Sequence, residues 1–66
     1  MKLDTEALKR LMGNKFYDAA TLAAKVGVST QSIRMYAWGK TQPKADTMRK
    51  LCEALECKPD DIVKEW

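Results

Sequence analysis

The segment from residue 18 to residue 40 constrains the fold most, because it predicts two short helices joined by a tight turn. Asp18 and Ser29 are residue types that cap helix N-termini, and each stands just before a helical pattern. Gly27 lies between the two patterns and permits the left-handed backbone that a sharp turn needs. The apolar positions at helical spacing, which we expect to be buried, are Leu22, Ala23, Val26, Ile33 and Tyr36.

The second of these helices, expected at about residues 29–38, keeps a face that the buried positions do not use. That face carries Thr30, Gln31, Arg34 and Met35. Their side chains can donate or accept hydrogen bonds or make apolar contacts, and the core does not need them. The sequence therefore predicts an outward surface suited to binding.

Three further helices are expected around this pair, over residues 4–13, 44–56 and 59–65. Gly13 and Asn14 are expected to stop the first helix, and Pro59 suits the first turn of the last. No segment carries the alternating pattern of a strand. The sequence predicts an all-α fold, a compact five-helix bundle formed by residues 1–66 as a single domain.

The charge is distributed unevenly along the chain. Residues 1–50 hold ten Lys and Arg against four Asp and Glu, a net charge of +6, whereas residues 51–66 hold two against five, a net charge of −3. A basic body with an acidic tail fits a polyanionic partner on one side of the molecule. An unevenly charged but simply solvated surface is the alternative explanation.

Cofactor, metal and membrane functions find little support in the sequence. Cys52 and Cys57 alone cannot complete a four-ligand zinc site, and the chain has no histidine. We expect Cys52 in the core and Cys57 partly buried, in a reducing, cytoplasmic compartment. No apolar run reaches the ~20 residues of a membrane span, and no signal peptide is evident. We expect no cofactor and no small-molecule ligand.

An enzymatic function is also not expected. The serines lack a neighbouring base, and Asp60 and Asp61 are explained by a helix N-terminus, where acidic side chains are favourable. The three glycines do not form a phosphate-binding loop. No catalytic residues are assigned.

Residues 8–63 resemble the Cro and phage-repressor family of helix-turn-helix proteins, also described as lambda-repressor-like or XRE-type. The resemblance rests on LAAKVGVSTQSI, then WGK, Pro43, TMRKLCEAL and KPDDI, in this order and at the family's spacing. It implies a compact bundle of about five helices that binds operator DNA, in most members as a dimer. It also implies a prokaryotic protein, of phage or mobile-element origin, in the cytoplasm and associated with the nucleoid.

Several positions depart from the family's pattern. Ala19 replaces a Gln that often contacts a phosphate, and alanine has no side-chain group for that contact. Ala37 replaces a common Glu, and Glu56 replaces a common Gly. Lys44 and Lys58 replace capping serines. Lys44 is a poor cap with the wrong sign for the helix dipole, which leaves a phosphate contact or simply a weak cap as explanations.

The resemblance assigns two sets of DNA contacts. The recognition helix, entering the major groove by its N-terminal end, would contact base edges, with Gln31 suited to adenine and Arg34 to guanine. The base-contacting residues are Thr30, Gln31, Arg34 and Met35. The phosphate candidates are Ser29, Ser32, Lys40, Thr41, Gln42, Lys44 and Lys15, with Lys25 as an outer contributor.

Trp38 lies off the expected core face. Its side chain has three possible roles: it packs under the following loop, it contacts a DNA sugar, or it contacts a partner protein.

The sequence thus predicts a sequence-specific transcriptional regulator, a repressor that binds a palindromic operator in double-stranded DNA as a homodimer. The candidates for the dimer interface are Leu55, Ile62, Val63 and Trp66, which can equally close the core of a monomer. The alternative function is a protein-interaction module on the same fold, such as an antitoxin, anti-repressor or adaptor with a protein partner.

Overall fold

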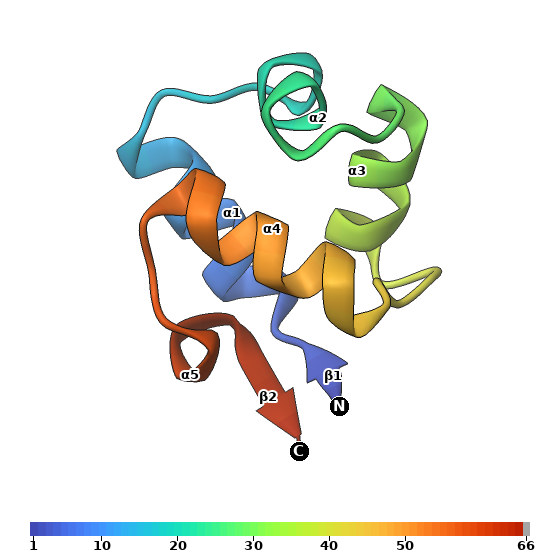
Figure 1. Cartoon of the computed structure of the whole chain (residues 1–66), viewed down its shortest axis with the longest axis vertical. Helices are drawn as coiled ribbons and strands as arrows, with labels where there is room; N and C mark the ends of the chain where they lie inside the picture. The colour runs from blue at the N-terminus through green and yellow to red at the C-terminus, as the bar shows by residue number, and fades with distance from the viewer. Residues whose placement is uncertain (66) are drawn as a thin grey trace.

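The computed structural model describes residues 1–65 and consists of five helices and a small two-stranded sheet (Figure 1). The elements follow the order β1 (Lys2–Leu3), α1 (Thr5–Asn14), α2 (Ala19–Val26), α3 (Thr30–Trp38), α4 (Ala45–Leu55), α5 (Pro59–Ile62) and β2 (Val63–Glu65). The helical bundle confirms the expected all-α architecture, to which the sheet is a minor addition. Trp66, one of the candidates for a dimer interface, lies outside the described residues.

Side-chain caps begin the first three helices, and those of the second and third helices are the predicted ones. Asp4 Oδ1 accepts the backbone N–H groups of Glu6 and Ala7, both at 3.1 Å. Asp18 Oδ1 accepts from the N–H of Thr21 at 2.7 Å. The backbone hydrogen bond lowers the pKa of the Asp18 carboxyl, which keeps the cap ionised.

The first four helices end with a residue in the left-handed conformation. Gly27 and Gly39 have φ angles of 85° and 74°, and Phe16 and Glu56 have φ angles of 58° and 53°. In each case the N–H of the following residue donates to a carbonyl five residues back, the bond of a Schellman motif. Helix α1 ends at Asn14, within the expected stop at Gly13 and Asn14, but the left-handed position falls on Phe16 and not on Gly13.

The last segment also differs from the prediction. The helix expected over residues 59–65 ends at Ile62, and residues 63–65 form β2, which pairs antiparallel with β1. Asp4 N–H donates to the Ile62 carbonyl at 2.7 Å, so the backbone turns toward the N-terminus instead of continuing the helix. The two ends of the described chain therefore lie side by side (Figure 1).

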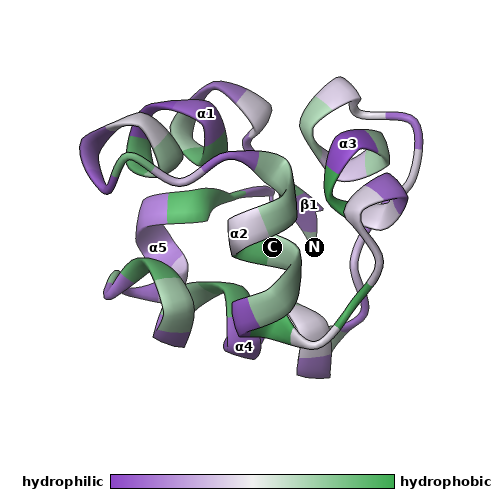
Figure 2. Cartoon of the chain, turned by 90° about the horizontal axis from the view of Figure 1, so that it is seen from above, coloured by the Kyte–Doolittle hydropathy of each residue, from purple (hydrophilic) through white to green (hydrophobic). Residues whose placement is uncertain are grey.

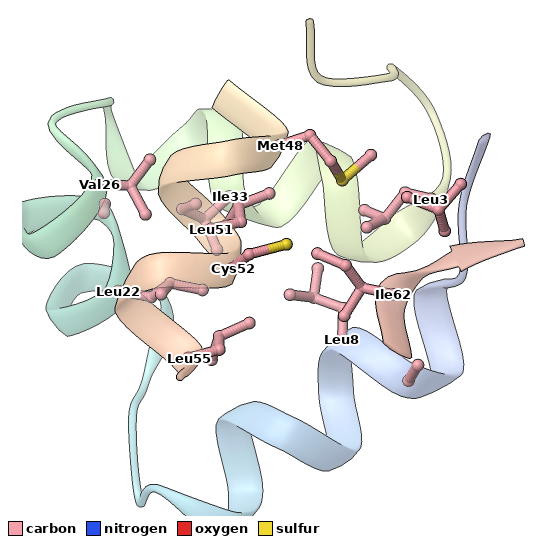
Figure 3. Close-up of a cluster of buried hydrophobic side chains, with 13 residues drawn as sticks. Leu3, Leu8, Leu22, Val26, Ile33, Met48, Leu51, Cys52, Leu55 and Ile62 are labelled. Atoms are coloured by element: carbon pink, nitrogen blue, oxygen red, sulfur yellow. The ribbon is translucent and has the colours of Figure 1, made fainter. Parts of the chain in front are cut away.

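The core draws side chains from every helix and from both strands (Figure 3). The sequence predicts most of it, whereas Leu3 and Ala7 were not expected there. The buried hydrophobic residues are Leu3, Ala7, Leu8, Leu22, Ala23, Val26, Ile33, Met48, Leu51, Cys52, Leu55, Ile62 and Val63. This single core fixes α2 against α3 and thereby orients the outward face of α3.

Candidate nucleic-acid interface

The turn between α2 and α3 positions the candidate binding surface. Gly27 adopts the left-handed conformation, and Val28 is half-buried against the core. Ser29 Oγ then caps α3 by accepting the N–H of Ser32 at 3.0 Å. Because Ile33 is fully buried and fixes the inner side of α3, the opposite side of that helix faces solvent.

The outer face of α3 carries an exposed stripe along its whole length. Gln31, Arg34 and Trp38 are all exposed, and they stand at positions i, i+3 and i+7, which share one side of a helix. Thr30 and Met35 flank this stripe and are half-buried. In the view of Figure 2, α3 lies at one edge of the molecule, across from α5.

The loop after α3 continues this surface. Lys40, Thr41 and Lys44 are exposed. Gln42 has a structural bond in addition, because its Oε1 accepts the N–H of Leu3 at 2.9 Å. This bond holds the loop against β1, a role that sequence reasoning missed because the partner is the other end of the domain.

The charge of this region favours a polyanion. From residue 19 to residue 45 the chain has no acidic residue, while it carries Lys25, Arg34, Lys40 and Lys44. Arg34, Lys40 and Lys44 are presented on α3 and the loop that follows, where their charge attracts phosphates, whereas Lys25 lies on α2. The helix-turn-helix therefore combines donors, acceptors and positive charge on one surface.

Besides Gln42, three phosphate candidates have partners inside the protein. The Ser29 and Ser32 hydroxyls lie 2.9 Å apart and bond to each other. The Lys15 ammonium forms an ion pair with Glu56, and this hydrogen bond raises the pKa of Lys15 and lowers that of Glu56. Lys15 is thus committed to joining the α1–α2 connection to the end of α4. Lys25, the outer contributor, lies over the Tyr17 ring at 5.3 Å.

The interface candidates near the C-terminus are not on the surface. Leu55, Ile62 and Val63 are only 1%, 0% and 7% exposed, because they close the core of the single chain. The hypothesis that these three side chains form a dimer interface is therefore corrected in favour of its alternative.

The two cysteines also lie where the sequence places them, Cys52 in the core and Cys57 half-buried beside it. Burial raises the pKa of both thiols, that of Cys57 to about 12. Among residues 1–65, no group of three or more His, Cys, Asp or Glu side chains is arranged to hold a metal ion. No helix in this part of the chain is long and apolar enough to cross a membrane.

The fold and this surface together define a helix-turn-helix DNA-binding domain. The profile of the Cro/C1-type HTH DNA-binding domain family matches residues 7–64. The chain belongs to this family. The match confirms the resemblance that the sequence motifs indicate.

Solved structures with the same fold belong to much longer proteins. The chain is similar to native PhpD with cadmium atoms, with a TM-score of 0.82, 23% identity, and coverage of 98% of this chain and 14% of that one. PhpD with cadmium and hydroxyethylphosphonate and a mutant of hydroxyethylphosphonate dioxygenase each give a TM-score of 0.81 at the same identity and coverage. These likenesses show the fold alone. Comparison with curated proteins gives no match.

Proposed function

We propose that this chain is a sequence-specific DNA-binding regulator whose helix α3 enters the major groove. The observation that carries the proposal is the exposed α3 face, where Gln31 and Arg34 lie within a segment free of acidic residues. Gln31 is suited to a bidentate contact with adenine and Arg34 to one with guanine. Thr30 and Met35 flank them and are suited to packing against a thymine methyl group.

Phosphate contacts come from the loop after α3 and from the start of α4. Lys40, Thr41 and Lys44 are exposed there and have the charge or hydroxyl groups that bind phosphate oxygens. Gln42 keeps its amide NH₂ for such a contact while its oxygen binds Leu3. Ser29 and Ser32 sit at the N-terminus of α3, where their hydroxyls extend this set. Lys15 is the least favoured of the phosphate candidates, because it is already paired with Glu56.

We further propose that the regulator is a repressor that acts as a homodimer on a palindromic operator. Half-sites on DNA lie about 34 Å apart, one helical turn. The longest dimension of the chain, measured over its Cα atoms, is 27 Å, so one copy does not span two half-sites. Since Leu55, Ile62 and Val63 are buried, a dimer would have to use other surface, such as the exposed sides of α4 and α5.

The test begins with selection of bound sequences from a random double-stranded DNA library, followed by fluorescence anisotropy. We expect a preferred sequence, and Arg34→Ala should reduce the preference for one base pair by about 1–3 kcal/mol. Lys40→Ala should weaken binding to all DNA sequences about equally and reduce the slope of log affinity against log salt by about one. Lys58→Ala, which removes the same charge before α5, is the matched control and should change neither.

Two results would contradict the proposal. One is equal affinity of the wild-type chain for selected and random DNA. The other is an Arg34→Ala variant with unchanged preference. A chain that protects no DNA in footprinting, yet binds a protein in stoichiometric amounts, would favour the alternative function of a protein-interaction module.

A further inference from the structure

Trp38 is a large apolar side chain that the fold leaves uncovered. It is the last residue of α3 and is 59% exposed. Of its three alternatives, packing under the following loop is excluded by this exposure. A domain this small has little apolar surface to bury, so leaving an indole in water forgoes stabilisation that the fold would otherwise gain.

The place of Trp38 on α3 connects it to the proposed DNA interface. It stands four residues after Arg34 and seven after Gln31, on the same exposed side of the helix. At 1.5 Å per residue, Trp38 lies roughly 10 Å along the helix axis from Gln31. The major groove is about 12 Å wide, so a helix that places Gln31 on the bases brings its far end to the groove margin. The sugar–phosphate backbone lies there.

The surroundings of Trp38 favour DNA over a protein partner. Lys40 follows two residues later, Arg34 precedes it by one turn, and no acidic residue occurs between Asp18 and Asp46. Trp38 therefore has a positively charged residue on each side of it in the chain. A phosphate-bearing partner satisfies the cations and covers the ring at the same time.

We infer that the Trp38 indole packs against the deoxyribose of the DNA backbone at the edge of the major groove, which extends the α3 contact beyond the base-contacting residues. This inference rests on the proposed function. The ring face covers sugar C–H groups, and the indole N–H is available to a phosphate oxygen. Because the side chain is uncharged, its contact releases no counterions and differs from those of lysine and arginine.

The experiment measures affinity for the selected operator and for random DNA over a range of salt concentrations. Trp38→Ala should weaken binding to both by roughly tenfold, the factor expected when about 55 Å² of apolar surface stays uncovered. The slope of log affinity against log salt should be unchanged, in contrast to Lys40→Ala. Trp38→Phe should keep affinity within about threefold, since it retains most of the apolar area.

A second readout comes from tryptophan fluorescence. The chain has two tryptophans, so a change in emission on DNA binding by the wild type should be lost in Trp38→Phe, which retains Trp66. Phe16→Ala is the control for loss of an exposed aromatic, because Phe16 is 95% exposed on the α1–α2 connection. It should leave affinity unchanged.

The outcomes separate this inference from the proposed function. If the wild type prefers its operator and Trp38→Ala binds with the same affinity, the inference is overturned and the proposed function stands. An equal loss in Phe16→Ala, or a reduced salt slope in Trp38→Ala, would also overturn it. If the wild type binds no DNA, both fail together. Thermal unfolding of each variant checks that the fold is retained.

Discussion

Phe16 and Glu56 hold a backbone conformation that residues with side chains adopt at a cost. Their φ angles of 58° and 53° lie in the left-handed region, where an L-residue is disfavoured by roughly 1–2 kcal/mol. At Gly27 and Gly39 the same motif carries no such cost. The ends of α1 and α4 therefore carry a conformational cost that the glycine-terminated ends of α2 and α3 do not.

Phe16→Gly should stabilise the protein by about 0.5–1 kcal/mol, because it relieves the left-handed backbone and loses almost no packing. Phe16 is 95% exposed, so Phe16→Ala should change the free energy of unfolding by little. Urea denaturation of both variants measures the difference. A glycine variant no more stable than the alanine variant would argue against strain at this position. Glu56→Gly should gain less, since it also loses the ion pair to Lys15.

Cys57 gives the protein a pH dependence at alkaline pH. Burial and the neighbouring Cys52 thiol raise the pKa of Cys57 from 9.0 to about 12. Because the folded-state pKa lies above the unfolded one, this contribution to stability is complete below about pH 9 and is lost as the pH rises toward 12. Urea midpoints should fall over this range, and less steeply in Cys57→Ala. Identical slopes for the two proteins would contradict the assignment.

At the scale of single elements, α4 is the helix whose N-terminus is least well satisfied. Lys44 makes no capping hydrogen bond, whereas α1, α2 and α3 each begin with a side-chain acceptor. A lysine also places positive charge at the positive end of the helix dipole. A phosphate contact of Lys44 and a weak helix cap both fit this arrangement, since Lys58 at the start of α5 likewise makes no side-chain capping bond.

Lys44→Ser should separate the two roles. Serine can cap α4, so the free energy of unfolding should rise by about 0.5–1 kcal/mol. If Lys44 contacts a phosphate, DNA affinity should fall at the same time, and the salt slope should decrease by about one. Lys58→Ser, the same change at the start of α5, is the control and should leave DNA binding unaltered. Unchanged DNA affinity in Lys44→Ser would leave a weak cap as the explanation.

At the scale of the whole molecule, the two ends of the chain close the fold. Leu3 pairs with Val63 across the sheet, and both side chains are buried in the common core. The N–H of Leu3 also holds Gln42 in the loop after α3. The strand pair therefore links the core to the loop that carries Lys40 and Thr41.

Leu3→Ala should destabilise the protein by about 2–5 kcal/mol, because it leaves a cavity where a fully packed leucine was. Lys2→Ala, an exposed neighbour in the same strand, should cost little. Circular dichroism during thermal unfolding measures both. Equal midpoints for the two variants would mean that the strand pair does not contribute to the core.

Local patterns in the sequence were sufficient to predict the helices and the helix-turn-helix. Asp18 and Ser29 cap the helices they precede, and Leu22, Ala23, Val26 and Ile33 are buried, whereas Tyr36 is only half-buried. These features depend on hydrogen bonds and contacts within a few residues, which one segment specifies by itself. The base-contacting and phosphate assignments remain predictions, although the exposed side of α3 is where the sequence placed it.

Only the tertiary structure decided which surfaces remain free. In the folded chain Leu55, Ile62 and Val63 are buried and Trp38 is exposed. Helix α5 ends at Ile62 and is followed by β2, and Lys15 pairs with Glu56. Each outcome depends on a segment distant in the sequence, such as β1 pairing with β2 or α4 meeting the α1–α2 connection. Periodicity states that a side chain is apolar, but the packing of the whole chain determines what covers it.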